Sequence, residues 1–297
     1  VTFNDGTVIT LRKPLLTIDK LAFGDMHPAT QFSARVAPPM IGLGLLESIP
    51  EATILEFARQ QKEENNGVSG KPNRVLDVQT DEMALGRFGW KAGQPNLMQQ
   101  NAAAFNGDLG LTSNLFPNEN CTSAQSTCKD FPNGGSPEVS DNILDFVEFY
   151  SQHLAVPIRR NVEDPQVVKG KTLFKESGCQ SCHQAEFRTA KREGLPALSE
   201  QLISPYTDML LHDMGEGLAD NRPEYLANGR EWRTTPLWGL GYTKEVNGHT
   251  FLLHDGRARN VMEAVLWHGG EAEHAKQNVL AFNEQERQAL LAFLDSL

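Results

Sequence analysis

Hydrophobic and polar residues alternate over residues 1–12, on both sides of an Asp5-Gly6 pair. A period of two is typical of a strand with one buried face, and an Asp-Gly pair between two such runs is typical of a tight turn. The pattern therefore predicts a small β-hairpin at the start of the chain.

Two later stretches of the first half have helical spacing. Apolar positions 54, 55, 57 and 58 predict a helix from Glu51 to Glu64, which starts after Pro50 and ends before an Asn-Asn-Gly run. A second helix is predicted to start after Ser140, a good N-cap residue, and to stop before Pro157. We expect its buried stripe to consist of Ile143, Leu144, Phe146, Val147, Tyr150 and Leu154.

Residues 65–140 lack a periodic pattern and are rich in glycine, proline, asparagine and serine. This composition predicts irregular surface structure. The composition changes around Arg159–Asp164, where we place a domain boundary. Residues 1–160 are predicted to form a loop-rich, partial companion domain, and residues 161–297 to form the second domain.

The second part of the chain has its own pattern of helices. A helix is predicted from Pro165 to Ser177, closed by Gly178, and two more are predicted over Ala258–His268 and Glu284–Leu297. Asn247-Gly248, between residues 242–246 and 249–253, predicts another hairpin. No repeat occurs at a fixed period. The fold class is therefore mostly α, with small β-hairpins.

Charge and hydropathy exclude two classes of protein. There are 27 Lys and Arg against 38 Asp and Glu, a formal net charge of −11, which argues against a protein that binds nucleic-acid backbones. The longest apolar run, residues 36–50, is interrupted by proline, glycine and glutamate and is shorter than the roughly 20 residues of a membrane-spanning helix.

The most specific motif is Cys179-Gln180-Ser181-Cys182-His183. Two thiols at this spacing can form thioethers with the vinyl groups of one porphyrin, while the adjacent imidazole binds the iron. The motif therefore predicts covalently attached haem c, with Cys179, Cys182 and His183 as its binding residues. Covalent attachment of this kind favours a periplasmic or otherwise exported protein.

Cysteines at this spacing also have two other uses in proteins. A thioredoxin-type redox pair does not need a histidine directly after the second cysteine, and a zinc site needs a second pair of ligands, for which Cys121 and Cys128 are the only source. These two lie in a polar loop with six residues between them, and a local disulfide is their simplest use.

The opposite face of the haem iron needs a second axial ligand. The residues that could supply it are His212, Met214, His254, His268 and His274. Each also has an ordinary structural role available; His268, for example, is placed to cap the C-terminal end of its helix. Spacing alone does not choose among them.

Several longer stretches resemble a known family. Glu231–Gly239, Leu253–Arg257 and Met262–Gly270 follow the haem motif in the order seen in bacterial di-haem cytochrome c peroxidases. More closely, the chain resembles the di-haem c-type oxidoreductases, a family of peroxidases or thiol oxidoreductases. That similarity is carried by Arg35–Pro39, Gly42–Glu47, Gly86–Ala92, Pro205–Asp208 and His212–Gly215. The resemblance extends over essentially the whole chain.

The resemblance implies a cytochrome c-like second domain and selects residues around its haem. In the related peroxidases, the position of His268 supplies the second axial ligand, commonly a methionine. A His183/His268 pair implies a low-spin electron-transfer haem with a lower potential than a His/Met site. Residues Arg233, His254, Asp255 and Arg257 match positions at the haem edge, where cations can neutralise propionates. A turn with its own ion pairs is their alternative role.

This sequence departs from the family in one respect, because the relatives have a second, N-terminal CxxCH motif. The simplest interpretation is that the chain is the C-terminal part of a longer protein whose first haem segment is missing. Trp90 is then predicted to relay electrons between the two haems, Glu47 to act as an acid or base at the substrate haem, and His27 to bind that haem. Core packing or solvation is the alternative for each.

The expected function is that of an exported, peroxidase-like oxidoreductase, in which this chain provides the electron-transfer haem. The alternative is a single-haem electron carrier or redox sensor without a substrate site. Oxidative cleavage of a hydrophobic substrate, as in distant relatives, is a third option. Expected partners are the missing haem segment and a small donor such as a cytochrome or cupredoxin. The resemblance also raises the question of a calcium ion that bridges the domains, as in some relatives.

Overall fold

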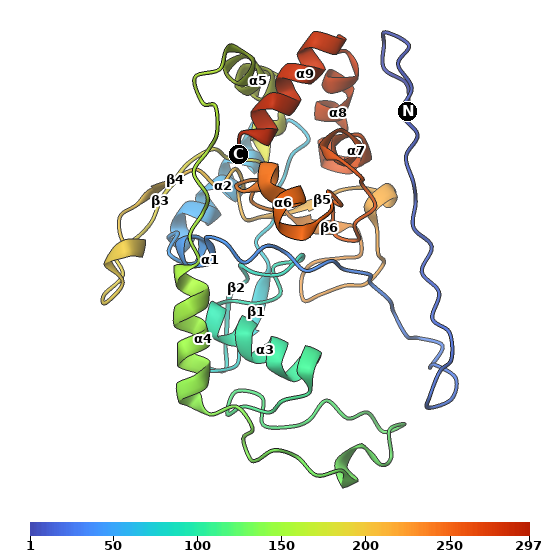
Figure 1. Ribbon diagram of the computed structural model, residues 1–297, viewed down its shortest axis with the longest axis vertical. Helices are drawn as coiled ribbons and strands as arrows, with labels where there is room; N and C mark the ends of the chain where they lie inside the picture. The colour runs from blue at the N-terminus through green and yellow to red at the C-terminus, as the bar shows by residue number, and fades with distance from the viewer.

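The computed structural model describes residues 1–297 and is mostly helical, with long loops and small antiparallel hairpins (Figure 1). The helices are α1 (Leu43–Glu47), α2 (Glu51–Glu64), α3 (Leu97–Leu109), α4 (Asp141–His153), α5 (Pro165–Glu176), α6 (Thr243–Asn247), α7 (Val261–Trp267), α8 (Glu273–Leu280) and α9 (Glu284–Asp295). No helix has the length and apolar character needed to cross a membrane.

The strands form three separate two-stranded antiparallel sheets. They are β1 (Arg74–Asp77) with β2 (Glu82–Leu85), β3 (Phe187–Arg188) with β4 (Leu202–Ile203), and β5 (Leu211–Asp213) with β6 (Glu231–Arg233). In the third sheet Leu211 pairs with Arg233, so this hairpin fixes both His212 and Arg233. The sheets are too short to form a layer and serve to position loops.

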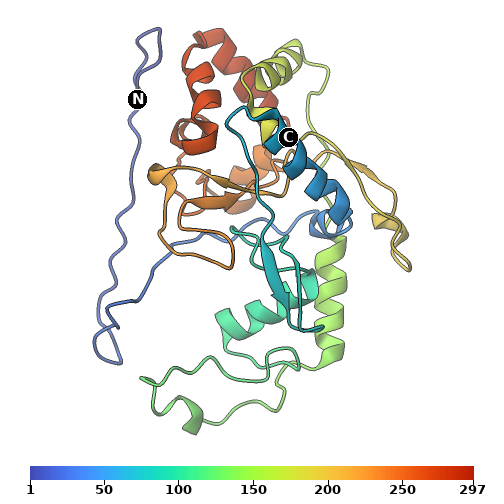
Figure 2. The ribbon, with the colours of Figure 1, turned by 180° about the vertical axis from the view of Figure 1, so that it is seen from behind.

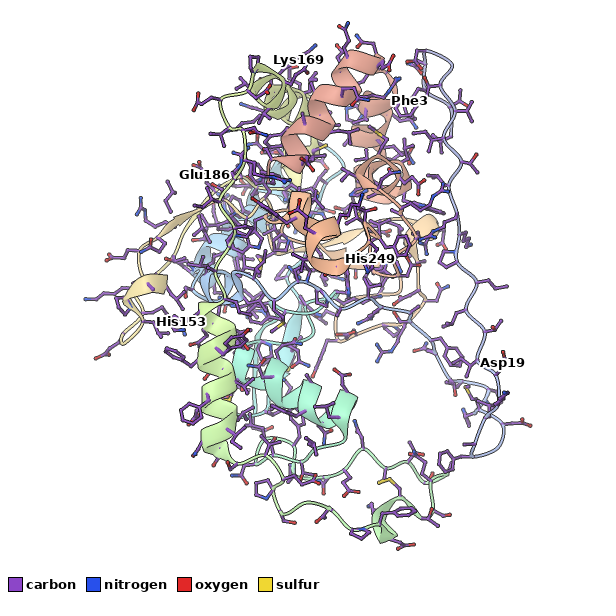
Figure 3. All side chains as sticks on the ribbon, in the orientation of Figure 1. Phe3, Asp19, His153, Lys169, Glu186 and His249 are labelled. Carbon is purple, nitrogen blue, oxygen red and sulfur yellow. A yellow bond between two sulfur atoms is a disulfide. The ribbon has the colours of Figure 1, made fainter.

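The C-terminal helices form one hydrophobic core. Helices α5 and α9 pack side by side, with α7 and α8 next to them (Figures 1 and 2). At the crossing of α5 and α9, Gly170 lies so close to α9 that an added Cβ would be 1.9 Å from the carbonyl oxygen of Ala289. Phe3 is buried in the same core and anchors the N-terminus to it (Figure 3).

A second core joins the two halves of the chain. Leu43, Leu46 and Leu97 from the first half pack with Leu210 and Trp238 from the second. The predicted boundary near residue 160 remains a prediction, and this second core contains side chains from both sides of it. The N-terminal segment, by contrast, runs along the outside of the molecule, where Asp19 is labelled (Figure 3).

Three predicted helices are confirmed almost to the residue. Helix α2 has the predicted bounds and ends at Asn65, whose backbone is left-handed. Helices α5 and α9 match the patterns around them, and Gly178 follows α5 with φ 92°. The helix predicted over Ala258–His268 is shorter, because Asn260 caps α7.

One predicted hairpin is confirmed and the other is wrong. Around the Asp5-Gly6 turn, Thr2 is bridged to Val8, the Phe3 nitrogen donates to the Thr7 carbonyl at 2.9 Å, and Val1 and Ile9 exchange two hydrogen bonds of 2.9 Å. The second is wrong, because residues 243–247 form helix α6 and Gly248, at φ 72°, ends it. An Asn-Gly pair fits a hairpin turn and a helix C-terminus equally well, since both require a left-handed backbone.

The expectation of irregular structure over residues 65–140 is also wrong in part. This region contains β1, β2 and α3, and the side chain of Asn96 caps α3 by accepting from the backbone nitrogen of Gln99. Helix α3 has many small and polar residues, which hid its period. The predicted disulfide is present between Cys121 and Cys128.

Helix α4 has the predicted position, but its predicted buried stripe is mostly on the surface. Only Leu144 is fully buried, whereas the exposed fractions of Ile143, Phe146 and Tyr150 are 49%, 71% and 66%. The periodicity correctly indicated a helix with one apolar face. That face is turned away from both cores of this chain.

Candidate haem site

The CxxCH motif lies directly after α5. Gly178 ends this helix, and Cys179–Ser181 make a single 3-10 turn, closed by a hydrogen bond from the His183 backbone nitrogen to the Cys179 carbonyl at 3.0 Å. The turn presents both thiols and the His183 ring to the same cavity. The spacing of the motif therefore has the structural consequence that haem attachment requires.

That cavity has a volume of about 1320 Å³ and a mostly apolar lining. This exceeds the roughly 300–1,000 Å³ of sites for drug-sized ligands. Its walls combine apolar side chains of α5, α7 and α9 with residues predicted from the sequence: Cys179, Cys182, His183, Arg233, His254 and His268. The fold thus brings the predicted axial pair and both thiols to one space.

The rings of His183 and His268 are held in the orientation of metal ligands. The Nδ1 atom of His183 donates to the carbonyl of Tyr206 at 2.8 Å, and that of His268 donates to the carbonyl of Ala264 at 2.7 Å. Because a carbonyl only accepts, each Nδ1 carries the proton and each Nε2 has a free lone pair. Metal-binding histidines use this arrangement.

Burial keeps both rings neutral, which is the form that binds iron. It lowers the pKa of His183 to about 4 and also lowers the pKa of His268. Tyr206, which orients His183, has a left-handed backbone at φ 53°, an uncommon conformation for a residue with a side chain. The surrounding fold therefore holds this carbonyl in place.

The two cysteines of the motif do not have the properties of a redox pair. Neither is in a disulfide, and burial raises the pKa of both thiols. Reactive thioredoxin-type cysteines have a lowered pKa instead. The environment therefore argues against a reversible dithiol–disulfide pair.

His212 is used by a buried ion-pair network rather than by the iron. Its Nε2 contacts Asp208 at 2.8 Å and its Nδ1 contacts Glu271 at 2.7 Å. Burial alone would lower the pKa of His212, but Asp208 and Cys182 outweigh it and raise the pKa well above the usual value. Although Cys182, Asp208 and His212 lie close enough to hold a metal together, this pairing already occupies both ring nitrogens.

Arg233 is a buried cation without an anionic partner. Its side chain donates to the backbone carbonyls of Gly89 and Thr234, and no carboxylate lies within 4.0 Å of its nitrogens. Burial lowers its pKa to about 10, so it remains charged. A buried charge normally needs a partner, and an acidic group of a ligand in the cavity would supply one. Haem, with its propionates, fits this donor set.

An aromatic stack extends from Arg233 toward the first half of the chain. The ring of His254 stacks on Trp232 at 3.8 Å, and Trp90 lies edge-on to His254 at 6.4 Å. All three line the cavity. The position of Trp90 suits the predicted relay role, which remains a prediction.

The side chains of two predicted site residues make their contacts outside the cavity. Arg257 pairs with Asp255 at 2.8 Å and does not line the cavity, so it matches the alternative of a turn with its own ion pair. Glu47 accepts from the Leu97 backbone nitrogen at 2.7 Å and faces Arg192 at 3.4 Å, also outside the cavity. These contacts hold Glu47 at the start of α3, and its acid–base role at a second haem remains a prediction.

The other ligand candidates are less well placed. Met214 and His274 line the cavity, but neither has a hydrogen bond that orients its side chain, and His274 is exposed. His27 is exposed on the N-terminal segment and its ring accepts from the Ala29 backbone nitrogen. Calcium remains a prediction.

Sequence reasoning missed the residues that act on the site through the backbone or through burial. Tyr206 offers a carbonyl that any residue type has, and Trp232 is one of four tryptophans. Asp208 and Glu271 have no local sequence pattern that sets them apart from other acids. Only the resemblance to a family, which includes Pro205–Asp208 and Glu231–Gly239, gave a signal for part of this set.

Comparisons with known proteins give the family. No curated protein matches the chain. A solved structure titled Kuenenia stuttgartiensis hydrazine synthase pressurized with 20 bar xenon aligns with 97% of this chain and 100% of its own, at 15% identity and a TM-score of 0.36, which is too low to support an argument. A family model described as "Di-haem oxidoreductase, putative peroxidase" matches residues 1–297. The chain therefore belongs to the di-haem oxidoreductase family, as the motifs in its sequence indicated.

Proposed function

We propose that this chain carries one haem c, bound covalently through Cys179 and Cys182 with His183 and His268 as axial ligands. The observation that carries the proposal is the pair of imidazoles at one cavity, each with Nδ1 bonded to a backbone carbonyl and Nε2 free. The proposal gives the second domain a cytochrome c-like role.

When bound, the haem supplies one-electron redox chemistry. The residues of the chain orient the ligands, balance charge and exclude water. Tyr206 and Ala264 fix the two imidazole planes, and their hydrogen bonds increase the basicity of the ligating nitrogens. Arg233 neutralises acidic groups at the buried edge. The apolar wall from α5, α7 and α9 excludes water, which lowers the local dielectric.

The wider proposal is an exported oxidoreductase of peroxidase type. The family is described as di-haem, whereas residues 1–297 contain one CxxCH motif. We therefore assign electron transfer to the site in this chain and peroxide reduction to a second haem outside these residues. A small donor protein, a cytochrome or a cupredoxin, would reduce the site. Periplasmic location and a bridging calcium ion are part of this proposal.

One observation favours the alternative of a plain electron carrier. His183 and His268 each have a free Nε2 atom at the cavity, and an iron bound by both would have no open position for a substrate. By itself the site would transfer electrons and would not bind peroxide. Turnover of peroxide by protein that carries both haems decides between an enzyme and a carrier.

The ligand assignment is tested by replacing His268 with alanine. We expect the purified haem protein to change from a six-coordinate, low-spin absorption spectrum to a high-spin one that binds carbon monoxide. His274→Ala is the matched control, because His274 also lines the cavity but is not oriented by a hydrogen bond. It should leave the spectrum unchanged.

Two results would refute the proposal in different ways. An unchanged spectrum in His268→Ala, with a changed one in His274→Ala, would move the second ligand to His274. Removal of all haem by acidic acetone would show that attachment through Cys179 and Cys182 does not occur.

A further inference from the structure

The outer face of α4 is apolar and uncovered. Ile143, Phe146, Phe149 and Tyr150 all lie on it, and each is about half exposed or more. Helix α4 stands at the edge of the molecule in both views, with no element on its outer side (Figures 1 and 2). Its exposed apolar residues form one stripe and are not scattered, and such a patch marks a contact surface.

A structural repeat shows what α4 corresponds to. The loop Arg35…Pro38…Gly42-Leu43-Gly44 has a counterpart in Arg233…Pro236…Gly239-Leu240-Gly241. In both loops the first of the two glycines is left-handed, with φ 69° at Gly42 and 75° at Gly239, and a helical turn follows. The loops differ in length by one residue, which is one reason why no fixed period is visible.

The two loops attach to α4 and α9 in the same way. The Gly42 nitrogen donates to the carbonyl of Leu154 at 2.8 Å, and the Gly239 nitrogen donates to that of Leu297 at 2.7 Å. The second glycine of each loop lies against the backbone carbonyl two residues before that acceptor. Gly44 lies against the carbonyl of Gln152, and Gly241 lies against the carbonyl of Asp295. Both contacts give the same alignment, so α4 is the counterpart of α9.

This alignment identifies what is absent beside α4. In α9, Ala289 and Phe293 are fully buried where Gly170 of α5 crosses. Their counterparts in α4 are Phe146 and Tyr150, which are exposed. The uncovered face of α4 is therefore the face that α9 turns to α5, and α5 is the helix that leads into the haem-binding motif.

The charges on these helices are complementary. Helix α5 carries Lys169, Lys171 and Lys175, all exposed, and Lys169 is labelled in Figure 3. Helix α4 carries exposed Asp141 and Asp145 at the N-terminal end of its apolar face. A lysine-bearing helix like α5 carries charges opposite in sign to those of α4, whereas a second copy of α4 carries the same acidic residues.

We propose that the outer face of α4 is the docking site for a haem-attachment helix from outside residues 1–297, an amphipathic, lysine-bearing helix of the α5 kind that leads into a second CxxCH motif. This deepens the proposed function, on which it rests, because it gives the second haem segment a place in the fold. Phe146 and Tyr150 form the centre of the contact, and Asp141 and Asp145 form its charged border.

The test uses haem-loaded protein and a synthetic peptide of residues 163–177. The peptide carries a fluorescent label and a hydrocarbon staple between positions 168 and 172, which are exposed in α5, so that it is helical in solution. Fluorescence anisotropy measures its binding. We expect Phe146→Glu to weaken binding at least tenfold, and Leu202→Glu, at a residue of similar exposure on β4, to change it less than twofold.

Three outcomes would overturn the proposal. The helical peptide does not bind, or it binds the Phe146→Glu variant as well as the parent protein. Alternatively, sedimentation shows a dimer that Phe146→Glu dissociates, which would make α4 a contact between copies. Haem content at Cys179 and Cys182, measured on the same samples, reports separately on the proposed function.

Discussion

Single hydrogen bonds decide what the histidines of this protein can do. His183 and His268 donate through Nδ1 to carbonyls and keep Nε2 free, whereas His212 has both nitrogens bound to carboxylates. All three residues are histidines, so the residue type does not explain the difference. The difference lies in which backbone or acidic group the fold places beside each ring.

His254 gives a prediction at this scale. Burial lowers its pKa to about 4, from 6.5 for an exposed histidine. Between pH 6.5 and 4 the unfolded chain therefore takes up a proton that the folded protein excludes, and the free energy of unfolding falls as the pH falls. The shift corresponds to roughly 3 kcal/mol at the acid end.

Replacing His254 with phenylalanine keeps an aromatic ring on Trp232 and removes the proton. We expect the stability of this variant to decline less between pH 6.5 and 4, as measured by urea unfolding at several pH values. Asp255 affects this range little, because its pKa is lowered from 3.8 and its contribution is lost mainly below pH 4. Parallel pH profiles for the two proteins would contradict this explanation.

At the scale of helices, two glycines provide a matched pair. An alanine at Gly170 in α5 would place its Cβ 1.9 Å from the Ala289 carbonyl, whereas at Gly107 in α3 nothing lies within 4 Å. We expect Gly170→Ala to destabilise the protein by about 1–3 kcal/mol through overpacking. Gly107→Ala should stabilise it by about 0.5–1 kcal/mol. Thermal unfolding measures both, and equal effects would show that the α5–α9 crossing is not closely packed.

Elements with both a periodic pattern and a clear end were predictable from the sequence. Helix α2 has Pro50 before it and Asn65 after it, and α5 ends at Gly178. Helix α6 was mistaken for a hairpin because Asn247-Gly248 suits both structures. The apolar face of α4 was found, but its burial was not predictable, because burial depends on what packs against a helix.

The candidate haem site was predictable in its local motif and not in its electrostatics. Cys179, Cys182 and His183 follow from local spacing, and His268 followed from the resemblance. Arg257 pairs locally, with Asp255 two residues before it. The environment of Arg233 instead depends on a distant segment, because its side chain donates to the carbonyl of Gly89 and has no acidic partner. A contact of this second kind leaves no mark in a single sequence.

The whole molecule is organised as two related halves around one shared core. Leu46 of α1 is fully buried in that core together with Leu210 and Trp238 from the second half. A core that contains side chains from both halves makes them unfold together, because neither half can open without exposing the apolar surface of the other. Cooperative unfolding is therefore expected despite the internal repeat.

Leu46→Ala tests this coupling. The substitution lies in the first half and should cost about 2–5 kcal/mol. Two probes follow urea unfolding: haem absorbance reports on the second half, and a dye attached to the cysteine of an Asp108→Cys variant reports on the first. We expect Leu46→Ala to lower the urea midpoint of both probes equally. Met83→Ala, at an exposed residue, should change both midpoints little. If the dye midpoint falls and the haem midpoint does not, the halves fold as separate domains divided near residue 160.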